Sequence, residues 1–88
     1  MHPKVRSVVP LTGKRLLVTF ETGAQKLYDC SPLLQTDTFR PLRDDWLFRM
    51  VRADAGGYGV SWTDELDLGE SELWEHGDPL TSEELVSS

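Results

Sequence analysis

The chain has 88 residues, of which 39% are hydrophobic and 27% charged, and its net charge is −6. This length allows one domain with one modest core and leaves little room for a deep, enclosed active site. No apolar run reaches the roughly 20 residues of a membrane-spanning helix. The first residues lack the apolar stretch of a secretory signal, and a single cysteine, Cys30, cannot form an internal disulfide. These features predict a cytoplasmic protein with no membrane association.

The first thirty residues predict a three-stranded antiparallel meander. Segments 5–9, 14–20 and 24–30 are rich in β-branched and aromatic residues. Turn signals separate them at Thr12-Gly13 and at Glu21-Thr22-Gly23. The apolar side of the middle strand consists of Leu16, Val18 and Phe20.

Two short helices are expected in the middle of the chain. Ser31 as N-cap with Pro32 in the first turn predicts one of them. Residues 36–40 read as a loop, and the proline that follows Arg40 favours an extended conformation for it. Asp44 or Asp45 then caps a second helix, which carries Trp46, Leu47, Phe48 and Met50.

The remaining elements predict an α+β fold. Segments 51–54 and 58–62 form a second hairpin around Ala55-Gly56-Gly57, and residues 64–68 continue extended. Residues 70–76 form a helix that ends at Gly77 as a left-handed C′ residue. We therefore expect an antiparallel three-stranded meander plus a second hairpin, with short helices packed on the sheet. The domain spans residues 1–78, and residues 79–88 form a flexible tail in which Thr81 to Leu85 has the form of a capping box.

No arrangement of residues predicts catalysis or cofactor binding. Cys30 ends a strand, and its spacing from His76 does not indicate a nucleophile–base pair, so a packing role is expected. The two histidines and one thiol match no zinc spacing. The acidic run from Asp64 places Leu66 and Leu68 where a calcium loop needs oxygen ligands. We expect no enzyme, no metal and no cofactor.

A basic and aromatic stretch raises the question of nucleic-acid binding. Arg40, Arg43, Arg49 and Arg52 flank Trp46 and Phe48, and cationic groups beside stacking rings are typical of single-strand binders. The sequence pI of about 4.7 opposes phosphate binding over most of the surface. Direct nucleic-acid binding is therefore not expected.

The charges are divided unequally along the chain. Residues 1–52 hold all nine basic residues against five acidic ones, a balance of +4, whereas residues 53–88 hold ten acidic residues and no basic one, a balance of −10. Either the two halves attract one another within the fold, or the second half presents an acidic face to a basic partner. Exposed aromatic rings would belong to such a face. The candidate partner-binding residues are Tyr58, Trp62, Asp64, Glu65, Asp67, Glu70 and Trp74.

Several segments together resemble a family of small bacterial proteins, domain-of-unknown-function family 2442. The segments are residues 5–11 (VRSVVPL), 16–23 (LLVTFETG), 29–34 (DCSPLL), 39–42 (FRPL) and 56–62 (GGYGVSW), followed by Asp67-Leu68 and Leu73-Trp74. The resemblance covers about residues 3–77, and it depends on the order and spacing of these segments rather than on any one of them. Where members often have a serine before the last helix, this chain has Gly69.

The resemblance implies a fold similar to the amino-terminal domain of a bacterial helix-turn-helix protein, and it carries over no catalytic residues. It also implies a gene neighbour from domain-of-unknown-function family 4160, a pairing suspected to be a toxin–antitoxin system. The chain stops where a helix-turn-helix would start, so DNA binding by this chain alone is not implied. The leading hypothesis is a non-catalytic protein-interaction module, whose specific form is the antitoxin-like partner in such a pair. The alternative is an accessory domain in transcriptional regulation that senses a ligand or forms a homodimer.

Overall fold

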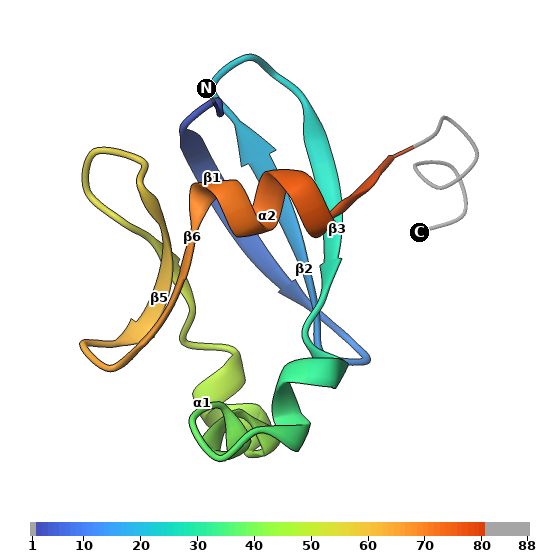
Figure 1. Cartoon of the computed structure of the whole chain (residues 1–88), viewed down its shortest axis with the longest axis vertical. Coiled ribbons are helices and arrows are strands. Elements are labelled where there is room, and N and C mark those ends of the chain that lie inside the picture. The colour runs from blue at the N-terminus through green and yellow to red at the C-terminus, as the bar shows by residue number, and fades with distance from the viewer. Residues whose placement is uncertain (1, 81–88) are drawn as a thin grey trace.

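The computed structural model describes residues 2–80 and contains two antiparallel sheets joined by short helices (Figure 1). The larger sheet has the strand order β1-β2-β3-β7. Its first three strands, β1 (Val5–Leu11), β2 (Arg15–Phe20) and β3 (Gln25–Asp29), form the predicted meander. The second sheet has the order β4-β5-β6, so the α+β class is confirmed.

The turn between β1 and β2 is tight because two successive residues adopt left-handed conformations. Gly13 has a φ of +77° and Lys14 a φ of +59°. Three residues, Thr12 to Lys14, connect the paired strand ends Leu11 and Arg15, and such short loops commonly need a residue in the left-handed region. Among residues 2–80, Lys14 is the one residue other than glycine with a positive φ. The turn therefore fixes the position of the Lys14 backbone at the end of the sheet where β1 meets β2.

The second sheet confirms the predicted hairpin and adds a third strand. Strands β4 (Arg52–Ala53) and β5 (Gly59–Thr63) pair as expected, and β6 (Leu66–Gly69) pairs antiparallel with β5. The extended conformation expected for residues 64–68 is found from Leu66 onward, whereas Asp64 and Glu65 form a turn. The chain reverses after Thr63, whose hydroxyl accepts hydrogen bonds from the N–H groups of Glu65 and Leu66.

The connection between the sheets consists of two 3₁₀ helices, η1 (Ser31–Gln35) and η2 (Arg40–Arg43), and the α-helix α1 (Asp45–Phe48). The N-cap of η1 is Cys30 and not Ser31, and no side chain caps it. Arg40 lies within η2 and is not extended, since the Leu42 N–H bonds to the Phe39 carbonyl and closes the turn around it. The N-cap of α1 is Asp44, one of the two residues predicted.

The predicted last helix, α2 (Glu70–His76), lies across the larger sheet (Figure 1). It buries Leu73 among core residues of both sheets, and Trp74 meets Phe20 edge to face with ring centroids 5.0 Å apart. Gly77 ends the helix in an extended conformation with a φ of −80°, so the expected left-handed C′ residue is absent there. A Cβ at Gly77 would lie 2.5 Å from the Leu73 carbonyl oxygen, and close packing explains the glycine instead.

The last described strand, β7 (Asp78–Pro79), pairs with β3. The Leu80 N–H also donates to the Gln25 carbonyl. Residues 79 and 80, which sequence analysis assigned to the tail, thus continue the sheet. The capping-box segment 81–85 lies outside the described residues.

Candidate partner-binding surface

The two tryptophans proposed for a partner surface are largely structural. Trp62 is only 3% exposed, and its indole Nε1 donates to the Phe48 carbonyl at 2.9 Å. Assigning Trp62 to a contact surface was therefore wrong, because its ring fills the core beneath α1. Trp74 is half-buried against Phe20, and the Lys26 Nζ lies 4.0 Å from its ring centroid.

Tyr58 is on the surface, with 63% of the residue exposed. The Lys4 Nζ lies 3.9 Å above its ring centroid. On another side the ring lies against Gly56, where an added Cβ would be 2.8 Å from the Tyr58 Cε2. Tyr58 is thus exposed, but its ring is already in contact with neighbouring residues of the same chain.

The acidic residues of the predicted surface do not form one cluster. Asp64 and Glu65 lie in the turn between β5 and β6. Glu70 lies at the opposite end of this hairpin, where its N–H donates to the Tyr58 carbonyl. Asp67 is exposed midway along β6, opposite Ser61. The structure therefore brings Tyr58 and Glu70 together at one end of the hairpin, whereas Asp64 and Glu65 lie at its other end.

The lysines and arginines of the first half do not pair with carboxylates of the second half in the described part of the chain. Among residues 2–80, no lysine or arginine nitrogen of the first half lies within 4.0 Å of a carboxylate of the second half. Glu72 and Glu75 pair with the histidines His76 and His2 at 3.2 and 3.0 Å. Lysines and arginines of the first half instead pair with its own carboxylates, and the acidic residues of the second half have no lysine or arginine partner in the described part of the chain.

A different exposed surface surrounds α1. Trp46 is 79% exposed and Met50 is 55% exposed, and 70% of the Arg49 side chain is accessible. Trp46 lies in α1 and Arg49 is its C-cap, whereas Met50 follows the helix, so the prediction that the helix carries Met50 is wrong. The chain still turns there, since the Met50 N–H bonds to the Leu47 carbonyl, and residues three and four positions apart in such a turn emerge on the same side. We call Trp46, Arg49 and Met50 the α1 patch. The sequence placed them on a helix, but it did not show that this side faces solvent while Leu47 and Phe48 pack on the core.

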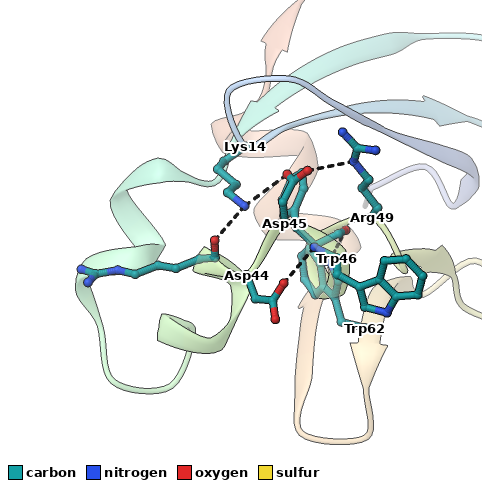
Figure 2. Close-up of polar contacts among 8 residues, drawn as sticks. Lys14, Asp44, Asp45, Trp46, Arg49 and Trp62 are labelled. Carbon is teal, nitrogen blue, oxygen red and sulfur yellow. Dashed lines mark hydrogen bonds and ion pairs between the residues drawn. The ribbon is translucent and has the colours of Figure 1, made fainter.

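Contacts from three segments hold the α1 patch in place (Figure 2). The Asp44 carboxylate accepts a hydrogen bond from the Trp46 N–H at 3.0 Å and so caps the helix. The Asp45 carboxylate lies between the Lys14 Nζ at 3.4 Å and the Arg49 Nε at 2.9 Å. Lys14 also donates to the Arg43 carbonyl at 3.2 Å. The left-handed turn that carries Lys14 is thereby fastened to α1.

A groove of about 420 Å³ runs beside this patch. The end of β1 and the turn after it form one wall, with Pro10, Leu11, Thr12 and Gly13, and α1 with its C-cap forms the other. Asp45 and Arg49 line the α1 wall. Apolar and polar groups therefore meet in one open depression next to Trp46 and Met50.

A second hollow, of about 310 Å³, lies between α2 and the end of β3. Its walls include the Glu72 carboxylate, which accepts a hydrogen bond from the Tyr28 hydroxyl at 2.8 Å and contacts His76 Nδ1 at 3.2 Å. Burial, and then the hydrogen bond to Glu72, raise the pKa of Tyr28 above its usual value. No group of three metal-ligating side chains is found among residues 2–80. The hydrogen bond between Tyr28 and Glu72 holds α2 against β3.

Cys30 is fully buried and belongs to the core. Burial, together with the nearby Asp29 carboxylate, raises the pKa of the Cys30 thiol to about 12. The thiolate is the reactive form of cysteine, so this side chain is unreactive near neutral pH.

The fold and this surface define a small α+β domain of two antiparallel sheets with an exposed aromatic patch on the connection between them. The chain belongs to the family described as protein of unknown function (DUF2442), whose model matches residues 5–79. No curated protein and no solved structure gives a significant match. Within residues 2–80, no helix has the length and apolar character needed to cross a membrane.

Proposed function

We propose that the chain is a non-catalytic module that binds a partner protein through the α1 patch. The observation that supports this proposal most directly is the exposure of Trp46 beside Met50 and Arg49 on one turn. Tryptophan and arginine carry a large share of the binding energy in protein interfaces, and methionine is enriched in them. The patch differs from the acidic face that the sequence suggested, and it lies on the other half of the chain.

The rigidity of the α1 patch adds to this argument. A partner that binds a preformed surface loses less conformational entropy than one that must order a mobile segment. The Asp44 cap and the Lys14–Asp45–Arg49 contacts fix the backbone on which Trp46 stands. None of the core residues depends on the Trp46 ring, since most of its surface is exposed. Its removal should therefore change binding and leave folding intact.

The specific form of the proposal is an antitoxin-like role, in which the partner is the product of an adjacent gene. Supporting it is the family membership, together with the resemblance from which this pairing was expected. Such a partner would bind during co-expression, and its toxicity to the cell would be relieved when this chain is present.

Co-expression of the chain with the adjacent gene product, followed by size-exclusion chromatography with light scattering, tests the proposal. We expect one peak with the mass of a complex for the wild type and two separate peaks for Trp46→Ala. Tyr58→Ala is the matched control, because it removes an exposed ring of similar size from the acidic half. Two separate peaks for the wild type would refute the antitoxin-like form. A complex that survives Trp46→Ala and dissociates with Tyr58→Ala would refute the α1 patch as the binding surface.

A further inference from the structure

The groove beside the α1 patch has unused hydrogen-bonding capacity at Arg49. Arg49 forms an ion pair with Asp45 through Nε, which lies 2.9 Å from the carboxylate, and no acceptor within residues 2–80 bonds to its two terminal nitrogens. The Asp45 carboxylate is shared between Arg49 and Lys14, so this cluster has two cations against one carboxylate. A planar guanidinium held through Nε presents its terminal nitrogens as a fixed fork that fits a carboxylate.

Apolar surface lies directly beside this fork. Pro10 and Leu11 line the groove itself, and Trp46 and Met50 are exposed next in sequence to its lining residues Asp45 and Arg49. Figure 2 shows Arg49 reaching Asp45 from the side opposite Lys14, on the same helical turn as Trp46. A ligand that fills the groove would therefore meet a cationic group and an apolar group a few residues apart.

We propose that this groove binds an acidic peptide segment of the partner protein. One carboxylate of the segment pairs with the terminal nitrogens of Arg49, and a neighbouring large apolar side chain packs against Trp46 and Met50. This inference rests on the proposed function, because it specifies the chemistry of the partner at the same surface. It reverses the expectation drawn from the acidic half of the chain, which pointed to a basic partner.

A peptide carboxylate fits the groove better than a nucleic-acid backbone does. Phosphate binding depends on several cations that each neutralise one phosphate. The lining of the groove contains one guanidinium, whose terminal nitrogens have no acceptor within residues 2–80, so it can pair with a single carboxylate but not with a row of phosphates. Pro10 and Leu11, the apolar residues of the groove, can also pack against an aliphatic or aromatic side chain of a peptide.

Selection of random 16-residue displayed peptides on the immobilised full chain, with counter-selection on Trp46→Ala, tests the inference without a known partner. We expect the enriched peptides to carry net negative charge around one large apolar residue. Enrichment of basic or uncharged peptides would overturn the inference and leave the proposed function standing. If no peptide distinguishes the wild type from Trp46→Ala, the α1 patch is not a peptide-binding surface, and both proposals fail.

The selected peptide then serves as the probe for Arg49. We expect Arg49→Gln to weaken binding at least tenfold in fluorescence polarisation, and Arg49→Lys to restore only part of it, because lysine keeps the charge and lacks the fork. Arg6→Gln, which removes the same charge from an exposed position at the far end of β1, is the control and should bind as the wild type does. Equal affinities of Arg49→Gln and Arg6→Gln would overturn the inference, as would Trp46-dependent binding of a dT20 oligonucleotide in place of the peptide.

Discussion

Two glycines that face each other across the second sheet should respond in opposite ways to the same substitution. Gly59 on β5 and Gly69 on β6 are paired in register. A Cβ at Gly59 would lie 2.1 Å from the Leu68 carbonyl oxygen, whereas a Cβ at Gly69 meets nothing within 4 Å. Gly59→Ser should therefore destabilise the domain, and Gly69→Ser should not.

The expected cost of Gly59→Ser follows from the movement it requires. Contacts of a Cβ shorter than 3.0 Å essentially never occur in proteins. The Leu68 oxygen must therefore move at least about 0.9 Å away from the new Cβ. Strands lie about 4.8 Å apart, so this movement disrupts ladder hydrogen bonds worth about 0.5–1.5 kcal/mol each. It also loosens the buried Leu68 and Val60 side chains. A loss of about 3 kcal/mol lowers the Tm of a domain of this size by roughly 12–24 °C.

Gly69→Ser adds the same atoms in open space at the N-cap of α2, where no side chain now caps the helix. A serine hydroxyl at this position accepts a backbone N–H, and we expect a gain of about a few tenths of a kcal/mol over glycine. Thermal and urea unfolding followed by circular dichroism measure both variants. A Gly59→Ser protein whose Tm lies within about 3 °C of the wild type would refute the close β5–β6 contact on which this estimate rests.

Three further predictions concern the core and the charges. Trp62→Phe leaves the Phe48 carbonyl without its 2.9 Å hydrogen bond and should cost about 1–3 kcal/mol in urea unfolding, whereas Trp46→Phe should cost almost nothing. The folded state keeps the Cys30 proton up to a pKa of about 12, and the unfolded state loses it near 9.0, so the free energy of unfolding should fall between these pH values by up to about 1.4 kcal/mol per pH unit. This slope should flatten in Cys30→Ala when stability is measured across that range; an unchanged slope would show that Cys30 does not cause it. Raising NaCl from 0.05 to about 0.5 M should raise the Tm by a few degrees, because salt screens the repulsion among the acidic residues of the second half, for which no lysine or arginine partner is found within residues 2–80. A lower Tm would mean that attraction between the two halves outweighs this repulsion.

The elements that the sequence predicted well are those whose pattern is local. The meander and the second hairpin follow from β-branched and aromatic residues between turn signals, and α2 was placed at the observed residues. Strand β7 has no such signal, because Asp78-Pro79 is a poor strand sequence and pairs only where the tertiary fold brings it to β3. Arg40 illustrates the same limit, since one hydrogen bond across it overrides the local preference set by Pro41.

The candidate surface was harder to predict because burial of an aromatic ring depends on distant contacts. Trp46 and Trp62 are equally apolar, yet one is exposed and the other is buried against the Phe48 carbonyl. The side of α1 that faces solvent is decided by Leu47 and Phe48, which pack on the core, and by Lys14, which lies thirty-one positions before Asp45. The spacing within residues 44–50 contains none of this information.

The unequal charge along the chain affects which surface an acidic partner can approach. Contacts of Lys14, Arg40 and Arg49 with carboxylates lie entirely within the first half, so the described acidic residues after position 53 keep their negative field without a lysine or arginine partner. An acidic segment approaching the molecule is repelled by the β5–β6 hairpin and attracted only where cations are exposed. Like-charge repulsion of this kind excludes wrong docking sites as effectively as attraction selects the right one. If the proposed interaction holds, we expect the acidic half to steer an acidic partner toward the first half of the chain, where the exposed cations and the groove beside Trp46 lie.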